Sequence, residues 1–336
     1  MTEPGHVRDM RAIVQDRYGS ADVWRLERIA PPAPGKDEVL IRVHAAGLDR
    51  GTWHAMTGQP YLMRVMGFGL RRPKQRVPGL DVAGVVVAVG GAVTRFAAGD
   101  EVFGVSRGSF AEFAVAREDK LAPKPPTLTF EQAAVVPISG MTALQGLRAG
   151  GLQAGQRVLV IGASGGVGSY AVQIARAEGA HVTGVCSAAK VDLVRSLGAD
   201  EVIDYTAEDF AAGPDRYDVI LDIGGNARLS RLRRALQPRG TLVIVGGEQG
   251  GKVTGGFGRS LRAPLLSPFV RQRLTMLVNK ETARDLEPLT ELIDAGRLAP
   301  SIDTTFPLER APEAMRRLDA GQVRGKVAIS VAGASR

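Results

Sequence analysis

The chain has 336 residues, of which 44% are hydrophobic and 23% are charged, and this composition predicts a globular protein of about two domains. Cys186 is the only cysteine, so an internal disulfide and a zinc site made of several thiolates are both excluded. Residues 1–10 lack the apolar core of a signal peptide, and no uncharged apolar stretch of about 18 residues follows. We therefore expect a cytoplasmic protein without a membrane anchor.

The formal net charge is +8, and the basic residues lie in separate patches, such as 71–76 and 231–239, rather than in one block. Patches of this kind indicate a solvated basic surface or the binding of a small anionic ligand. The pattern disfavours nucleic acid as the partner, because no continuous basic stripe is present.

Residues 1–126 contain short runs of strand-forming residues, separated by turns rich in Gly and Pro. This half of the chain therefore predicts a curled, mostly antiparallel sheet. The predicted strands cover residues 11–15, 38–45, 82–89, 101–105 and 111–115.

The pattern changes near Thr129, which forms a capping box with Gln132 at the start of an Ala-rich helix. Apolar runs then alternate with helical segments, which predicts a doubly wound parallel sheet because parallel neighbours need crossover connections. The predicted strands are 157–161, 181–186, 201–203, 217–223, 241–245 and 273–278, and the helices between them are 167–178, 188–197 and 227–236.

Beyond residue 279 the alternation stops. The remaining elements are a helix over 282–295, an extended piece at 304–306, a helix over 312–319 and a strand over 326–331 that could rejoin the first sheet. We therefore assign residues 1–126 and 280–336 to one domain and residues 127–279 to the other.

The strongest motif is an apolar run that leads into a glycine-rich turn and a helix over residues 158–168. Glycines let backbone N–H groups approach a pyrophosphate, which the positive end of the following helix stabilises. We therefore predict a dinucleotide site. Its candidate residues are Ala163, Ser164, Gly165, Gly166, Val167 and Gly168.

The end of the second parallel strand indicates which dinucleotide binds. Residues 185–190 contain no acid that would accept a hydrogen bond from a ribose 2′-hydroxyl, and they contain Ser187 and Lys190 instead. A hydroxyl and an ammonium suit a 2′-phosphate, so we predict NADPH rather than NADH. The alternative is that Ser187 caps the next helix and Lys190 is a solvated surface residue.

Three further residues follow strands of the predicted parallel sheet. Tyr205 follows the third strand, where an aromatic ring could contact the adenine, although an ordinary turn residue is an alternative. Gly224 and Gly246 follow the fourth and fifth strands, at the sheet edge where such folds bind ligands. We list all three as candidate cofactor contacts, with turn glycines as the alternative for the last two.

Together with the glycine-rich turn, several motifs resemble those of the medium-chain dehydrogenase/reductase superfamily over nearly the whole chain. Residues 78–84 read Pro-Gly-Leu-Asp-Val-Ala-Gly, residues 99–104 read Gly-Asp-Glu-Val-Phe-Gly, and residues 144–147 and 325–327 also match. The zinc-free, zeta-crystallin-like quinone oxidoreductase branch is most similar. This resemblance implies an α/β protein with a GroES-like, mostly β catalytic domain and a Rossmann domain.

The resemblance also implies roles for single residues. Lys326 would belong to the cofactor-binding set, and the hydroxyl of Thr142 would contact the nicotinamide, with helix capping as the alternative for Thr142. Zinc-dependent relatives carry Cys, His and acidic ligands at positions where this chain has Leu48-Asp49, Leu80-Asp81 and Ile138. Leu and Ile cannot bind a metal, so we expect no catalytic zinc.

The resemblance places the catalytic candidates in one cleft segment. Arg50, Thr52, Trp53 and His54 could each donate a hydrogen bond to a developing oxyanion or pass on a proton through water, although Trp53 could instead be a packing residue. Asp49 stands where many relatives have Asn. A carboxylate there would repel an enolate unless it is protonated or hydrogen-bonds the ribose or a donor side chain.

Two segments, residues 60–76 and 257–273, combine apolar and basic side chains beside the implied cleft. They could form an apolar lid over a bulky hydrophobic substrate. An interface between copies of the chain is an equal alternative, and a peripheral membrane contact is a third, because basic residues could face anionic headgroups.

The implied activity is hydride transfer from NADPH to a quinone or an α,β-unsaturated carbonyl. The alternatives are an NADP-dependent alcohol or aldehyde reductase, and a protein that binds NADPH without catalysis, as a sensor or an RNA-binding protein. We also expect a homodimer, because the apolar run at 274–278 would form an edge strand able to pair with a second copy.

Overall fold

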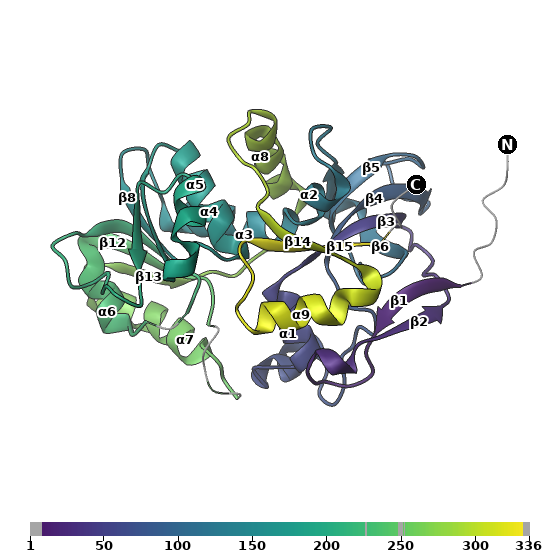
Figure 1. Cartoon of the computed structure of the whole chain (residues 1–336), viewed down its shortest axis with the longest axis horizontal. Helices are drawn as coiled ribbons and strands as arrows, with labels where there is room; N and C mark the ends of the chain where they lie inside the picture. The colour runs from purple at the N-terminus through teal and green to yellow at the C-terminus, as the bar shows by residue number, and fades with distance from the viewer. Residues whose placement is uncertain (1–8, 226, 248–250, 252, 332–336) are drawn as a thin grey trace.

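The computed structural model describes residues 9–225, 227–247, 251 and 253–331. It has two lobes, each built on one large sheet, with helix α3 (Pro137–Gly150) between them (Figure 1). The lobe on the right of Figure 1 holds the mostly antiparallel sheet, and the lobe on the left holds the parallel sheet. The predicted α/β fold class is confirmed.

The first lobe contains a seven-stranded sheet in the order β14-β15-β3-β4-β5-β7, with β6 also paired to β3, and a small separate sheet of β1 and β2. The predicted return of the chain to this sheet is confirmed, because β15 pairs antiparallel with β3 and parallel with β14. The strands are β1 (Met10–Val14), β2 (Arg25–Ile29), β3 (Glu38–Leu48), β4 (Asp81–Val89), β5 (Glu101–Val105), β6 (Phe113–Arg117), β7 (Leu121–Pro123), β14 (Ile302–Pro307) and β15 (Lys326–Ser330).

The second lobe contains six parallel strands in the order β10-β9-β8-β11-β12-β13, as the alternating pattern predicts. The strands are β8 (Arg157–Ile161), β9 (His181–Cys186), β10 (Glu201–Asp204), β11 (Tyr217–Asp222), β12 (Leu236–Ile244) and β13 (Arg273–Met276). The helices are α4 (Gly166–Ala177), α5 (Val191–Ser196), α6 (Leu229–Ala235) and α7 (Phe257–Leu266).

Helices near the predicted domain boundaries connect the two lobes. The capping box of Thr129 and Gln132 is present at α2 (Phe130–Ala134), but this helix packs on β3 and β4 rather than on the parallel sheet to which its residues were assigned. Helix α8 (Ala283–Asp294) packs on α3 and β7. A single cluster of buried apolar residues contains side chains from both sheets, so the lobes share one core.

The remaining elements lie around the space between the lobes. Helix α1 (Arg50–Thr57) directly follows β3, and the π-helical turn η2 (Arg64–Phe68) follows α1. Helix α9 (Ala311–Asp319) precedes β15. The backbone N–H of Leu62 donates to the carbonyl of Val253 over 3.1 Å, so the segment at 60–76 contacts the chain just before the segment at 257–273.

Candidate cofactor and substrate site

The glycine-rich turn between β8 and α4 has the backbone geometry of a dinucleotide cradle. Gly162 has a φ of +89°, a conformation that favours glycine. A Cβ on Gly168 would lie 2.1 Å from the carbonyl oxygen of Gly162, so any side chain there would collide with the turn. The first N–H groups of α4 have no carbonyl partner within the helix and therefore face the space where a pyrophosphate would bind.

The antiparallel lobe touches this turn through the start of β15. The backbone N–H of Gly325 donates to the carbonyl of Ser164 over 2.9 Å. A Cβ on Gly166 would lie 3.0 Å from Cδ of Lys326 and 3.1 Å from Oγ of Ser139. The turn residues predicted from the sequence thus lie together at the junction of the two lobes.

Lys326 is buried and its ammonium faces protein groups beside the turn. Its Nζ lies 3.3 Å from a carboxylate oxygen of Asp81 and 3.0 Å from Oγ of Ser139. The other oxygen of Asp81 accepts the backbone N–H of Ile138 at 2.8 Å. Burial raises the pKa of Asp81 to about 7, although the nearby Lys326 opposes this shift. Sequence reasoning found Lys326 but not its partners, because they lie far apart along the chain.

One carboxylate oxygen of Asp49 accepts two hydrogen bonds, and the other accepts none within the described protein. It caps α1, where its Oδ1 accepts the backbone N–H of Thr52 at 2.7 Å and the hydroxyl of Thr52 at 3.1 Å. Asp49 is only 7% exposed, and its Oδ2 has no hydrogen-bond partner within the described protein. A buried, unpaired carboxylate oxygen is costly, so this atom is a candidate acceptor for a hydrogen bond from a bound molecule.

The other cleft candidates are held by protein contacts. The indole N–H of Trp53 donates to Asp319 over 2.8 Å, so this group is engaged and the packing role fits better than a role as oxyanion donor. Nδ1 of His54 lies 2.6 Å from the carbonyl of Gln59 and must carry the proton, which leaves Nε2 as an acceptor in the neutral ring. Burial lowers the pKa of His54 and favours this neutral form.

Thr142 lies in the interior of α3, so the helix-capping alternative is wrong. Its hydroxyl donates to the carbonyl of Ile138 at 2.6 Å and accepts the side-chain N–H of Asn279 at 3.0 Å. Sequence reasoning missed Asn279, which follows the last strand of the parallel sheet and carried no motif. Through this contact, Thr142 joins the helix between the lobes to the end of that sheet.

Ser187, Lys190 and Tyr205 gather at the carboxyl ends of β9 and β10. Ser187 occupies the N-cap position of the 3-10 turn at residues 188–190, as its alternative role requires, but its side chain makes no capping hydrogen bond. The alternative for Lys190 is wrong, because its Nζ donates to the backbone carbonyls of Gly321 and Val323 at 3.0 and 2.7 Å. Burial lowers the pKa of Lys190.

Asp204, which was not among the predicted site residues, lies close to Ser187. Asp204 ends β10 opposite Cys186, and hydrogen bonds from Thr206 and from the backbone N–H of Ala188 hold its pKa below the ordinary value. Its carboxylate is therefore tied to the turn that carries Ser187. Tyr205, the next residue, is exposed, and only its backbone is anchored, to the carbonyl of Cys186.

Gly224 and Gly246 lie where the fourth and fifth parallel strands end, and Gly224 is close to the glycine-rich turn. A Cβ on Gly162 would lie 3.0 Å from the backbone nitrogen of Gly224. The carbonyl of Gly246 accepts a guanidinium N–H of Arg259 at 3.0 Å. The same guanidinium forms an ion pair with the buried Asp222, whose pKa is raised by burial. Sequence reasoning missed this pair.

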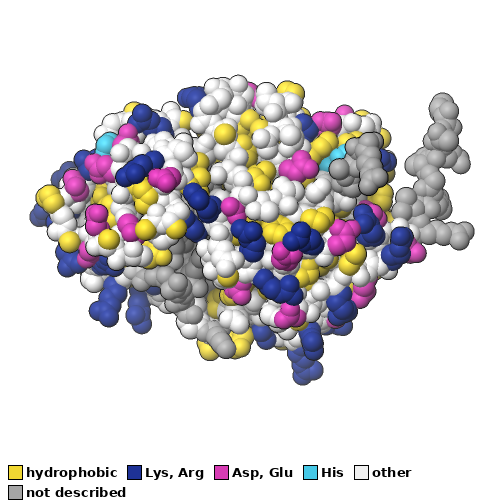
Figure 2. Space-filling view, viewed as in Figure 1, with side chains coloured by type: hydrophobic (Ala, Val, Ile, Leu, Met, Phe, Trp, Pro, Cys, Tyr) yellow, Lys and Arg dark blue, Asp and Glu magenta, His cyan; other side chains and the backbone are white. Residues whose placement is uncertain are grey.

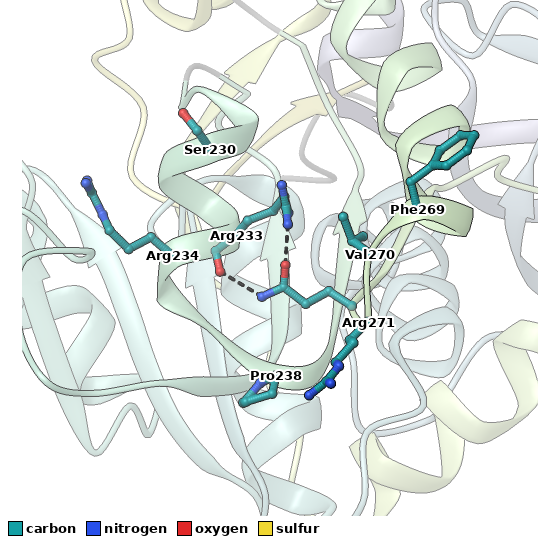
Figure 3. A pocket seen from close by; sticks show the side chains of 8 residues that line it. Ser230, Arg233, Arg234, Pro238, Phe269, Val270 and Arg271 are labelled. Carbon is teal, nitrogen blue, oxygen red and sulfur yellow. Dashed lines mark hydrogen bonds between the residues drawn. The ribbon is translucent and has the colours of Figure 1, made fainter.

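A surface pocket of the second lobe lies away from this site (Figure 3). Its lining residues come from α6, from the first residues of β12 and from the segment just before β13, so it opens at the amino ends of those strands. The glycine-rich turn lies at the carboxyl end of β8. The lining residues are Ser230, Arg233, Arg234, Pro238, Phe269, Val270, Arg271 and Gln272.

The donors near the cleft do not fit a catalytic zinc ion. Within the described residues, no group of three His, Cys, Asp or Glu side chains could hold a metal. Leu48 and Ile138 offer no donor atom, and the carboxylate of Asp81 is already paired with Lys326. A tetrahedral zinc site needs at least three protein donors, which these described residues do not supply together.

Comparison with known proteins identifies the family. Residues 35–126 match the model of the alcohol dehydrogenase GroES-like domain, and residues 197–329 match the model named zinc-binding dehydrogenase. The chain is 36% identical to the chloroplastic NADPH-dependent alkenal/one oxidoreductase of Arabidopsis thaliana, over 96% of this chain and 80% of the relative.

Two further relatives agree. The chain is 31% identical to the chloroplastic quinone-oxidoreductase homolog of Spinacia oleracea, over 95% of this chain and 98% of the relative. Its fold matches the quinone oxidoreductase of Coxiella burnetii with a TM-score of 0.86 and 28% identity, over 96% of this chain and 99% of the other. The chain belongs to the medium-chain dehydrogenase/reductase superfamily, in its quinone-oxidoreductase branch.

Proposed function

We propose that this protein uses NADPH to reduce a quinone or an α,β-unsaturated carbonyl without zinc. One observation carries the proposal: a glycine-rich cradle lies at the junction of the two lobes, where Gly325 and Lys326 meet the turn, and among the described residues no group of three His, Cys, Asp or Glu side chains could hold a metal. The relatives named as quinone and alkenal/one oxidoreductases support the same chemistry.

The residues fit a dinucleotide. The turn from Ala163 to Gly168 would hold the pyrophosphate, and the unpaired Oδ2 of Asp49 would accept a hydrogen bond from a ribose hydroxyl. A bound nicotinamide supplies a hydride to an electron-poor carbon of the substrate. The conjugated oxygen then carries the negative charge, which lets hydrogen-bond donors replace a Lewis acid.

His54 and Arg50 are the candidates for the substrate side of the cleft. Nε2 of neutral His54 can accept a proton or a hydrogen bond from water, so His54 would relay a proton rather than donate one directly. The guanidinium of Arg50 lies 5.5 Å from the ring centroid of Trp53 and brings a positive charge to the start of α1. Thr142 would position the helix beside the nicotinamide through its contact with Asn279.

The test uses the full chain treated with a metal chelator. We expect it to oxidise NADPH rapidly with phenanthrenequinone or an enone, and slowly with an aldehyde, as followed by loss of nicotinamide absorbance. The Gly168→Val variant should lose this activity because its side chain would enter the turn, whereas Gly91→Ala, in open space, should keep it. Activity that needs added zinc, or aldehyde turnover above quinone turnover, would contradict the proposal.

We propose that Ser187 and Lys190 select NADPH over NADH. Ser187→Asp places a carboxylate where the 2′-phosphate would bind, so we expect kcat/KM for NADPH to fall by on the order of 100-fold, with little change for NADH. Ser196→Asp makes the same charge change at an exposed position of α5 and should leave both values unchanged. Equal losses with the two cofactors would show that Ser187 does not select.

The homodimer and the cytoplasmic location remain predictions. Strand β13 pairs only with β12 among the described strands, so its outer edge could join a second copy in a homodimer. No described helix is long and apolar enough to cross a membrane.

A further inference from the structure

An acid-free stretch of sequence follows the cleft segment. No Asp or Glu lies between Asp49 and Asp81, and the basic residues in that interval concentrate at 71–76. The interval contains α1, the turn η2 and the extended chain that leads to β4. Its surface therefore carries positive charge that no acid of the same segment neutralises.

Apolar side chains in this stretch face solvent. Val65 and Met66 lie in η2 and are 71% and 66% exposed, and Leu70 is 70% exposed. Tyr61 and Leu62 are exposed as well. Large apolar side chains that are this exposed and this close together along the chain are characteristic of interaction surfaces.

The turn that presents these side chains is firmly attached to the first lobe. Arg64 donates to the carbonyls of Gly58 and Thr57 at 2.9 and 3.2 Å, and its guanidinium stacks over the rings of Tyr18 and Tyr61. The hydroxyl of Tyr18 also donates to the carbonyl of Gly69 at 2.6 Å, at the end of the turn. The apolar side chains therefore project from a fixed support.

Basic side chains surround a pocket directly beside Leu70. Arg71, Arg72 and Lys74 are exposed and form no ion pair within the described part of the chain. The one acid of the pocket, Asp16, is paired with Arg25 and Arg76 at 2.6 and 2.8 Å. The pocket has a volume of about 490 Å³, and its lining residues are Gln15, Asp16, Gly69, Leu70, Arg71, Arg72, Pro73, Lys74 and Arg76.

We propose that residues 61–74, the basic and apolar segment, bind the surface of an anionic lipid bilayer. Val65, Met66 and Leu70 would enter the boundary between headgroups and acyl chains, while Arg71, Arg72 and Lys74 would face lipid phosphates. The charge of the segment is complementary to an anionic leaflet, and each basic residue near such a surface adds to the attraction. This inference does not depend on the proposed reductase activity.

The combination of charges and apolar side chains favours lipid over the other possible partners. A nucleic acid would match the charges, but it would leave Val65, Met66 and Leu70 unused, since its bases stack on aromatic rings. A second copy of the chain would bury the apolar side chains and bring the unpaired cations of both copies together. In Figure 2, Lys and Arg side chains protrude from the lower edge of the molecule, where α1 lies in Figure 1.

The experiment measures sedimentation of the full chain with vesicles. We expect binding to phosphatidylcholine vesicles that contain phosphatidylglycerol, and little binding to phosphatidylcholine alone. Arg71→Gln/Arg72→Gln/Lys74→Gln should lower the partition coefficient by on the order of 100-fold. Val65→Ser/Met66→Ser should lower it by roughly tenfold without changing the charge.

Matched variants control for charge and hydrophobicity alone. Arg239→Gln/Arg284→Gln/Arg297→Gln removes three exposed cations elsewhere, and Val89→Ser/Val278→Ser removes two exposed apolar side chains elsewhere. Both should bind like the original protein, and far-UV circular dichroism should confirm that every variant is folded.

Several outcomes would overturn the proposal. The original protein could fail to bind anionic vesicles, or it could bind neutral vesicles equally well. The control variants could also lose as much vesicle binding as the variants of residues 61–74. Release by inorganic phosphate at constant ionic strength would reveal a site for the free ion, and RNA that displaces the vesicles at matched charge would favour nucleic acid. Because vesicle binding is measured without turnover, a failed binding result leaves the reductase proposal intact.

Discussion

The imidazole of His54 has a fixed tautomer because a backbone carbonyl accepts its Nδ1 proton. Burial lowers its pKa from the ordinary value of 6.5, so the folded protein binds a proton there only at lower pH than the unfolded chain does. The unfolded chain therefore gains a proton first as the pH falls. Linkage requires that acid weakens the fold through this residue.

We predict that the free energy of unfolding falls below about pH 6.5, with a slope from His54 of at most about 1.4 kcal/mol per pH unit. His54→Asn keeps a donor for the carbonyl of Gln59 but cannot titrate. Urea unfolding of both proteins at several pH values isolates this contribution from that of His44, whose pKa is also lowered by burial. Parallel pH profiles for the two proteins would contradict the prediction.

Helix α7 is joined to the parallel sheet by one buried ion pair. Arg259 binds the carboxylate of Asp222 at the end of β11 and also donates to the carbonyls of Gly246 and Ala227, each at 3.0 Å. The other oxygen of Asp222 accepts the N–H of Gly225 at 3.1 Å. Removal of the guanidinium would leave this carboxylate buried without a cation.

Arg259→Met should therefore lower the free energy of unfolding by about 3–5 kcal/mol. Asp222→Asn/Arg259→Met should recover part of this loss, because Asn is neutral and can still accept from Gly225. Arg262→Met changes an exposed residue of the same helix and should alter stability by no more than about 0.5 kcal/mol. Urea unfolding followed by circular dichroism measures all three, and equal losses for Arg259→Met and Arg262→Met would refute the assignment.

Elements with a strong local pattern could be predicted from the sequence. The glycine-rich turn and the six parallel strands are each formed by residues that are neighbours in the sequence. Their sequence pattern therefore indicated both the parallel sheet and a dinucleotide ligand. Strand β7 has only three residues and β2 is largely exposed, so neither produced a clear apolar pattern. The predicted helix over 188–197 is a short 3-10 turn followed by the shorter α5.

The parts of the site that could not be predicted are contacts between distant segments. Trp53 donates to Asp319, and Lys190 donates to carbonyls near β15. Asp204 reaches the turn after β9 from the next strand. No local sequence pattern indicates such pairs, because only the fold brings their residues together. The predicted donors of the cleft are engaged for this reason, and the unpaired oxygen of Asp49 is visible only in the structure.

At the scale of the whole molecule, the two lobes share a core. One buried cluster includes Ala83 and Phe103 of the antiparallel sheet together with Val160 and Leu221 of the parallel sheet. Both tryptophans, Trp24 and Trp53, belong to the first lobe. Their fluorescence therefore reports on one lobe, whereas circular dichroism reports on the helices of both.

We predict that the unfolding transitions measured by tryptophan fluorescence and by circular dichroism coincide, because neither lobe can unfold without exposing the shared core. NADPH at about 100 times its Kd should stabilise both transitions equally, by about 2.7 kcal/mol. Two separate midpoints, or a cofactor shift in only one signal, would show that the lobes unfold independently.

The position of β15 also determines when the protein can fold during synthesis. This strand lies between β14 and β3 in the antiparallel sheet, and the residue just before it, Gly325, contacts the glycine-rich turn. Until the ribosome has released residues 325–330, the edge of β3 that pairs with β15 lacks its partner, and the cradle lacks its contact with the first lobe. An exposed strand edge invites association with other chains. Nascent chains that stall before this point would therefore depend on chaperones, even though strands β1 to β14 are already made.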